Sequence, residues 1–166
     1  MAEMAEEETH ALVPSVRGRY FEEFDVGEEV VSFGRTVTEA DIVAFAALTG
    51  DWNPLHTDAR YAAGTMFGQR IAHGLLGLSI ASGLAVRLGF MEGTVEAFLG
   101  LDWDFRAPIY IGDTIYMKAQ VKEKKPIRRL GGGIITFYVE VVKQDGKVAQ
   151  RGEWKVLIRS KPSEEG

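Results

Sequence analysis

Two histidines and one aspartate stand close together in the sequence, within Gly50-Asp51-Trp52-Asn53-Pro54-Leu55-His56 and Ile71-Ala72-His73-Gly74. A carboxylate and an imidazole that bracket a water molecule make an acid–base pair, because one can accept a proton while the other donates one. Pro54 prevents a helix from continuing through the first run, so we expect a compact loop in which Asp51 and His56 converge on one point. Asn53 is suited to holding this loop by bonding to its own backbone.

His73 and Gly74 stand where a long apolar helix is expected to begin. The first N–H groups of a helix have no partner within the helix, and with the helix dipole they can stabilise a developing oxyanion. Glycine at this point lets a substrate approach the backbone closely. An acid–base pair beside an oxyanion donor is what the addition of water to a double bond conjugated with a carbonyl requires.

The same residues also have structural interpretations. Gly50-Asp51 and Asn53-Pro54 make a good helix stop and turn for purely local reasons. His73 can cap or pack at the helix start, and we favour that role over a direct catalytic one. A zinc site built from Asp51, His56 and His73 is a third interpretation. The histidines lack the repeated spacing of a metal site, so we expect no metal.

Three helices are expected around the motif. Thr38, followed by acidic residues, is a good N-cap for the first helix, and Gly50 is a good stop for it. The last helix has apolar or small residues on every side, and a helix of that kind is expected to be enclosed by other structure. The expected helices cover residues 39–48, 58–63 (one short turn) and 73–88.

Beyond the long helix, apolar residues recur at every second position, the period of a strand. Asp145-Gly146 is a strong hairpin turn. Lys122–Pro126 and Gly131–Gly133 interrupt the pattern, as a turn and a bulge would. Consecutive strands joined by short turns imply an antiparallel sheet, so we expect an α+β fold with a central apolar helix against a curved sheet. Strands are expected at 29–37, 101–105, 115–121, 135–141 and 148–158.

The chain of 166 residues, 46% of them hydrophobic, is expected to form one domain at residues 18–161. Residues 1–17, which include His10, are expected to be a disordered acidic tail, and residues 162–166 a flexible C-terminus. There is no cysteine, which excludes disulfides and thiolate metal sites and fits a cytoplasmic protein.

Two classes of partner are not expected. Because the N-terminus is acidic we expect no secretory signal, and the longest apolar stretch, Ile71–Val86, is expected to be too short to span a membrane. With 19 basic and 24 acidic residues the formal net charge is −5, which argues against a generally basic nucleic-acid surface.

The motif resembles that of a known family. Asp51-x-Asn53-Pro54-Leu55-His56, followed by Phe67-Gly68-x-x-Ile71-Ala72-His73-Gly74, closely resembles the signature of the MaoC-like dehydratases, the (R)-specific enoyl-CoA hydratases. The similarity extends from Tyr20 to Asp113. It implies a hot-dog fold, in which the curved antiparallel sheet wraps around the long helix. It also implies a homodimer or a higher oligomer.

The resemblance places the catalytic pair on Asp51 and His56 and the oxyanion amide on Gly74, with Asn53 and His73 in support. The implied reaction is reversible syn addition of water to a trans-2-enoyl thioester of coenzyme A. The product is an (R)-3-hydroxyacyl thioester. No cofactor is implied, because coenzyme A is part of the substrate. The resemblance also places the acyl group along the long helix, where it would meet the side chains of Leu78, Ser82 and Ala85.

The sequence leaves the contacts of the coenzyme A phosphates open, and acyl carrier protein remains a possible alternative carrier. In an acidic protein such contacts must come from a local basic patch or from backbone amides. A charged run at a hairpin can equally be a solvated face. The candidates are Arg70, Arg106, Lys122, Lys124, Lys125, Arg128 and Arg129.

Three other functions are open. An acyl-CoA thioesterase of the same fold would direct water at the thioester carbonyl, although the Asn53-Pro54-Leu55-His56 continuation favours a hydratase. A dehydratase of a branched or dicarboxylic acyl-CoA would share the mechanism and differ only in its pocket. A non-catalytic acyl-CoA-binding subunit is the third, but it should have lost Asp51 or His56, and this chain has both.

Overall fold

A computed structural model describes residues 18–162 of the chain. The acidic N-terminal segment 1–17 and nearly all of the C-terminal segment 162–166 lie outside the described residues. Within the described part, no helix combines the length and the apolar character that crossing a membrane requires. The elements in order are η1 (Phe21–Glu23), β1 (Glu29–Val31), β2 (Arg35–Thr36), α1 (Glu39–Thr49), α2 (Pro54–Thr57), α3 (Ala59–Ala63), α4 (Gly74–Arg87), β3 (Val95–Phe105), β4 (Thr114–Ile127), η2 (Arg128–Leu130), β5 (Gly132–Lys143) and β6 (Val148–Arg159).

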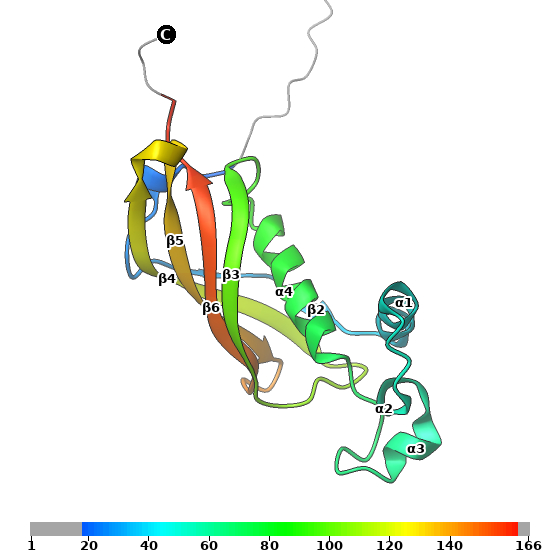
Figure 1. Ribbon diagram of the computed structural model, residues 1–166. Helices are drawn as coiled ribbons and strands as arrows, with labels where there is room; N and C mark the ends of the chain where they lie inside the picture. Colours follow the sequence, from blue (N-terminus) through cyan, green and yellow to red (C-terminus); the bar gives the residue numbers. More distant parts are fainter. Residues whose placement is uncertain (1–17, 163–166) are drawn as a thin grey trace, which may run out of the picture.

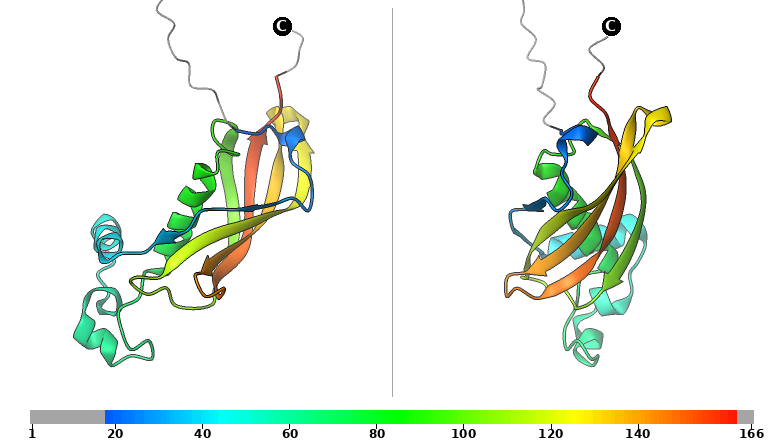
Figure 2. Two further views of the ribbon diagram at one scale, coloured as in Figure 1. Left: turned by 180° about the vertical axis from the view of Figure 1, so that it is seen from behind. Right: turned by 90° about the vertical axis from the view of Figure 1, so that its left-hand side faces the viewer.

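The strands form one curved antiparallel sheet in the order β1-β4-β5-β6-β3, with β2 pairing beside β1 on β4 (Figure 1). The long strands curve around α4, which lies against one face of the sheet (Figure 2). One face of α4 is buried there, and its buried residues are Leu76, Gly77, Ile80, Ala81, Leu84 and Ala85. This confirms the expected helix in a curved antiparallel sheet.

The first and last helices begin and end as their sequences predict. The Thr38 hydroxyl accepts a hydrogen bond from the Asp41 amide, and the Asp41 carboxylate accepts one from the Thr38 amide at 2.8 Å. This reciprocal cap satisfies two backbone donors that would otherwise be unpaired. Gly50 closes α1 with φ = 78°, a left-handed conformation that favours glycine.

The helices α1, α2 and α3 lie together beyond the N-terminal end of α4, clear of the long strands (Figure 1).

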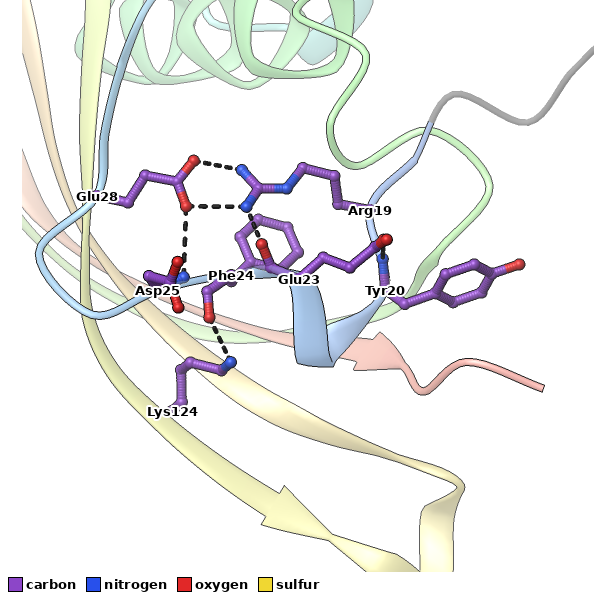
Figure 3. A network of polar contacts seen from close by, with 7 residues as sticks. All are labelled: Arg19, Tyr20, Glu23, Phe24, Asp25, Glu28 and Lys124. Atoms are coloured by element: carbon purple, nitrogen blue, oxygen red, sulfur yellow. Dashed lines mark hydrogen bonds and ion pairs between the residues drawn. The ribbon is translucent and has the colours of Figure 1, made fainter. Parts of the chain in front are cut away.

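Residues 18–28, which include η1, lie at the end of the sheet that carries η2 (Figure 1) and are held there by polar contacts (Figure 3). The Arg19 guanidinium pairs with the Glu28 carboxylate, which also accepts a hydrogen bond from the Asp25 amide. From β4, the Lys124 ammonium donates to the Phe24 carbonyl. Phe24 itself is only 1% exposed and packs edge-on against Phe90 and Phe137, so this segment closes one end of the core.

Three sequence expectations about the sheet are wrong. The run expected as one strand at 29–37 is divided into β1 and β2. Gly131–Gly133 is not a bulge within a strand, because Gly131 ends η2 and β5 begins at Gly132. Lys122–Pro126 is not a turn, because β4 continues to Ile127 with a bulge near Val121. Pro126 is tolerated there because β1 pairs with β4 only as far as Gln120, which leaves the far part of β4 as a free edge.

The expectation that α4 is enclosed on all sides is also wrong for the single chain. Leu75 is 59% exposed and Val86 50% exposed on the face that turns away from the sheet. The edge strand β3 is likewise open, with Phe98, Leu99 and Leu101 each about half exposed. The helix α4 therefore has more apolar surface than the sheet of one chain covers.

Candidate active site

The loop after α1 brings Asp51 and Asn53 to the start of a short helix. The Asn53 side chain accepts a hydrogen bond from the Leu55 amide at 3.0 Å and so caps α2. Pro54 is the first residue of α2, where its fixed φ fits and its missing N–H is not needed. The expectation of a loop that continues to His56 is therefore wrong, because a short helix begins at Pro54, although the loop held by Asn53 is confirmed.

His56 lies on α2 and is only 9% exposed. Its Nδ1 atom is 2.8 Å from the carbonyl oxygen of Ile71. A carbonyl can only accept, so this nitrogen carries the proton. In the neutral ring Nε2 is then left without a proton, as a general base requires.

His73 is 3% exposed and immediately precedes α4. Its side chain does not cap the helix. Its Nε2 atom instead donates to the carbonyl oxygen of Asp51 at 2.9 Å. The ring lies between Phe45, at a centroid distance of 5.0 Å, and His56, at 3.8 Å. These contacts support the structural role that the sequence favours for His73.

The side chains of Asp51, His56 and His73 converge, as expected for the first two. One potential ligand atom from each lies within 4.8 Å of the others. One nitrogen of each ring is already bonded to a backbone carbonyl, which leaves the other nitrogen of each ring for a proton or an ion. The distances would suit a bound water molecule or a metal ion. The absence of a metal therefore stays a prediction.

Gly74 is the first residue of α4, so its N–H has no acceptor within the helix. A Cβ atom built on Gly74 would lie 2.7 Å from the Phe105 ring. The close approach of Phe105 therefore favours glycine at this position, and access of a substrate to the Gly74 backbone stays a prediction.

A cavity of about 650 Å³ opens between α2, the start of α4 and the segment that follows β3. This volume lies in the range of small-molecule sites, and most of the lining is apolar with a few polar groups, as is usual for such sites. Asp51 is not part of the lining, but it stands beside His56, which is. The lining residues are His56, Phe67, Ile71, Ala72, Gly74, Leu75, Phe105, Arg106, Ala107, Pro108, Ile109 and Gln150.

The three residues expected along the acyl group lie elsewhere in the single chain. Ala85 is fully buried against the sheet, and Leu78 packs against the core. Ser82 lines a separate groove of about 130 Å³ between α4 and β3. None of the three lines the cavity beside His56, so their contact with an acyl group stays a prediction.

Most of the basic candidates for the coenzyme A phosphates have protein partners or lie far from the cavity. Lys122 pairs with Glu153, and Arg70 pairs with Glu39 at 2.5 Å. The turn η2, which carries Arg128 and Arg129, lies at the end of the sheet opposite α2 (Figure 1). Arg106 alone among the candidates lines the cavity.

The sequence interpretation missed Gln150 on β6. Its side chain is 2% exposed and reaches the carbonyl oxygen of Gly74. A signal for it exists, because Gln150 shares the strand parity of Trp154, Val156 and Ile158, which all face the core. A polar residue at an inward position must find a partner there.

The helix wrapped by a curved antiparallel sheet is the hot-dog fold, which similar solved structures share. Within that fold the chain belongs to the MaoC-like domain family, which matches residues 23–143. The family predicted from the Asp51–His56 and Phe67–Gly74 motifs is therefore confirmed.

Three similar proteins illustrate the relationship. A 3-hydroxybutyryl-CoA dehydratase of Methylorubrum extorquens is 39% identical over 120 residues, which cover 71% of this chain and 73% of that protein. An (R)-specific enoyl-CoA hydratase of Aeromonas caviae is 37% identical over 72% of this chain and 84% of its own length. A solved structure described as a monoamine oxidase regulatory protein from Archaeoglobus has a TM-score of 0.81 and 42% identity, covering 87% of this chain and 97% of that one. The hydratase and dehydratase names support the predicted enzyme class, a hydro-lyase.

Proposed function

We propose that the protein catalyses reversible hydration of a trans-2-enoyl-CoA to the (R)-3-hydroxyacyl-CoA. The observation that carries the proposal is the convergence of Asp51 and His56 within 4.8 Å, with His56 and the Gly74 backbone lining the same cavity. The names of the hydratase and dehydratase relatives support it.

In the proposed reaction a water molecule lies between Asp51 and His56. The unprotonated Nε2 of His56 accepts one proton of this water while the water oxygen adds to C3 of the enoyl group. The Asp51 carboxylate orients the water; its Oδ1 atom already accepts from the Asn53 amide at 3.2 Å, which fixes its direction. A proton returns from the pair to C2, so that H and OH are added to the double bond and the enzyme is regenerated.

The Gly74 amide is assigned to the thioester oxygen. As C3 is attacked, negative charge moves onto this oxygen, and a helix N-terminus places an N–H group and the positive end of the helix dipole towards it. Removing one such donor typically costs about 3–4 kcal/mol of transition-state stabilisation.

We assign the coenzyme A part of the substrate to the side of the cavity that Arg106 lines. Arg106 is exposed at the cavity and makes no ion pair with another described residue. We expect it to contact a phosphate of coenzyme A. Arg106→Leu should then raise KM for an enoyl-CoA while leaving kcat nearly unchanged. An unchanged KM would remove Arg106 from the carrier site.

A homodimer is part of the proposal, because the outer face of α4 and the edge of β3 leave apolar side chains open in the single chain. An exposed apolar edge strand is an association site unless it is covered. Sedimentation at micromolar concentration should give a dimer or a larger oligomer, and Leu101→Lys on the β3 edge should weaken it. A wild-type monomer would contradict this assignment.

The proposed function is tested by following the absorbance of crotonyl-CoA in the presence of the purified protein, with a thiol reagent in a parallel sample. Loss of absorbance without thiol release is expected. Release of thiol would reassign the protein as a thioesterase. If neither occurs, branched, longer and dicarboxylic enoyl-CoAs test whether only the acyl group is wrong, and the hydratase assignment fails if all of them are inert. Prior dialysis against a chelator should not change turnover, because the proposed steps use only protein groups and water.

A further inference from the structure

Gln150 occupies an unusual position for a polar side chain. It lies on β6, is only 2% exposed, and sits on the face of the sheet that packs against α4. Burying an amide costs free energy unless its groups are hydrogen-bonded, and an apolar side chain would fill the space without that cost. The contacts of Gln150 show what the amide does there.

Both ends of the Gln150 amide are paired. Its Nε2 donates to the Gly74 carbonyl at 2.9 Å, and its Oε1 accepts from the Trp103 indole N–H at 3.1 Å. A carbonyl can only accept and an indole N–H can only donate, so a single orientation of the amide satisfies both. Trp103 thus fixes the direction in which Gln150 presents its N–H groups.

Neighbouring residues make room for this bridge. A Cβ on Gly77 would lie 2.4 Å from Nε2 of Gln150, so glycine at this position lets the amide pass beneath α4. Phe105 is the direct cross-strand partner of Gln150 and is the ring against which Gly74 packs. Gly74 is therefore held by two adjacent side chains. Phe105 of β3 packs against its Cα, and Gln150 of β6 binds its carbonyl.

The residue on the other side of the Gly74 amide is also anchored. His73 donates to the Asp51 carbonyl at 2.9 Å. The Gly74 N–H therefore lies between two fixed points, one set by His73 and one by Gln150. Glycine is the residue with the greatest backbone freedom, and an amide that must meet a developing oxyanion cannot be free to turn.

We propose that Gln150 is a positioning residue that, oriented by Trp103, holds the first turn of α4 so that the Gly74 amide faces the thioester oxygen. The inference rests on the proposed function, since it concerns the same oxyanion amide. It predicts an effect on kcat and not on KM, because a misdirected amide loses contact mainly with the charge that develops in the transition state.

Gln150→Leu tests the bridge by removing both hydrogen bonds at similar volume. The expected result is a decrease in kcat of about 10- to 100-fold with KM within a factor of about two, because small misplacements of a catalytic group have effects of this size. A kcat equal to that of the wild type in a folded variant would overturn the proposal.

Gln150→Glu separates positioning from packing. The protonated carboxyl can donate to the Gly74 carbonyl and accept from Trp103, whereas the carboxylate repels the Gly74 carbonyl. The kcat of this variant should therefore be near that of the wild type at low pH and fall as the pH rises, a dependence that the wild type lacks. Parallel pH profiles for the two proteins would contradict the proposal.

Gly77→Ala displaces the amide without touching Gln150 itself. Alanine favours helix over glycine, but its Cβ would also lie 2.9 Å from Cδ1 of the buried Ile109, so some loss of stability is expected together with the fall in kcat. Gly83→Ala is the matched control, because a Cβ on Gly83 meets nothing within 4 Å. Sedimentation of both variants checks that the oligomer is unchanged. Equal kcat values for the two variants would count against the bridge.

Amide hydrogen exchange keeps the inference separate from the proposed function. If the wild type hydrates no enoyl-CoA, the proposed function fails, but Gln150→Leu should still speed exchange at Leu76 and Gly77, whose amides bond to the His73 carbonyl, relative to the buried Leu84. Unchanged exchange in the first turn of α4 would overturn the positioning role whatever the activity.

Discussion

The imidazole rings of His56 and His73 are stacked, with their centroids 3.8 Å apart. Each ring also bonds to one backbone carbonyl, His56 to that of Ile71 and His73 to that of Asp51. Ile71 precedes α4 and Asp51 follows α1, so the two histidines join the loop after α1 to the segment before α4. These contacts set the positions of Asp51 and His56, the proposed acid–base pair, relative to the Gly74 amide.

Replacement of His73 by phenylalanine tests these contacts. Phenylalanine retains a ring between Phe45 and His56 but cannot donate to the Asp51 carbonyl. We expect turnover to fall about tenfold, since the loop that carries Asp51 loses its anchor, and the unfolding free energy to fall by about 1 kcal/mol. His73→Gln, which can restore a donor, should recover part of the turnover. Wild-type turnover in His73→Phe would show that the hydrogen bond does not position Asp51.

The acid–base pair is tested by Asp51→Asn and His56→Gln. Both replacements remain polar, and glutamine can still donate to the Ile71 carbonyl, but neither new side chain can take a proton from water. Each variant should lose at least about 100-fold in kcat with the fold retained, as is typical for loss of an acid–base group. Circular dichroism and thermal unfolding provide the control. Near-normal turnover in either folded variant would remove that residue from the mechanism.

Gly74→Ala should separate activity from stability. The new Cβ would lie 2.7 Å from the Phe105 ring, so the ring or the first turn of α4 must move. Because alanine favours helix over glycine by about 0.5–1 kcal/mol, stability should change little while kcat falls. Adding Phe105→Leu should relieve the contact and recover part of the loss. If Gly74→Ala is as active as the wild type, the amide does not need its present position.

An ion pair between Asp113 and Lys143 should make stability depend on acid pH. The two groups are 2.7 Å apart, and their side chains are only 10% and 8% exposed. Burial alone would raise the pKa of Asp113, but hydrogen bonds from Gln144, Lys143 and the Tyr110 amide together hold its pKa below the ordinary value of 3.8. Because the pKa of Asp113 is lower in the folded protein than in the unfolded chain, the ionised carboxylate stabilises the fold above about pH 3.8. This contribution is lost as the pH falls through the folded-state pKa.

The measurement is the unfolding free energy by denaturant titration at about pH 7 and at about pH 3 for the wild type and Asp113→Asn. The wild type should lose stability on acidification. The variant should already be weaker by about 3 kcal/mol at neutral pH, because Lys143 is left buried without its partner, and its stability should change less with pH. Equal acid dependence in both proteins would contradict the role of this pair.

The parts of the fold that the sequence predicts are those set by local rules. Thr38 and Gly50 mark the ends of α1 because cap and stop residues act within one turn. Asp145-Gly146 predicts the β5–β6 hairpin for the same reason. The convergence of Asp51 and His56 also follows from a short segment whose turn residues leave few conformations.

The parts that were predicted wrongly or missed depend on distant partners. Period-two patterns do not say which strands pair, so the β3–β6 pairing was not expected. The strand at Pro126 is possible because β1 begins only at Glu29, opposite Gln120, which no local pattern reports. Gln150 was missed because its partners, Gly74 and Trp103, lie 76 and 47 residues away in the chain. Strand parity marks Gln150 as inward, but only the fold shows what it holds.

The most direct test of the central claim, that Asp51, His56 and the Gly74 amide add water to an enoyl thioester on one face, is hydration of crotonyl-CoA in D₂O. Chiral analysis and NMR of the product would give the configuration at C3 and the position of the deuterium at C2. We predict (R)-3-hydroxybutyryl-CoA with one deuterium at C2, added on the same face as the hydroxyl group. The (S) product would contradict the proposed site geometry. So would deuterium on the face of C2 opposite the hydroxyl group, or a mixture of both configurations at C2.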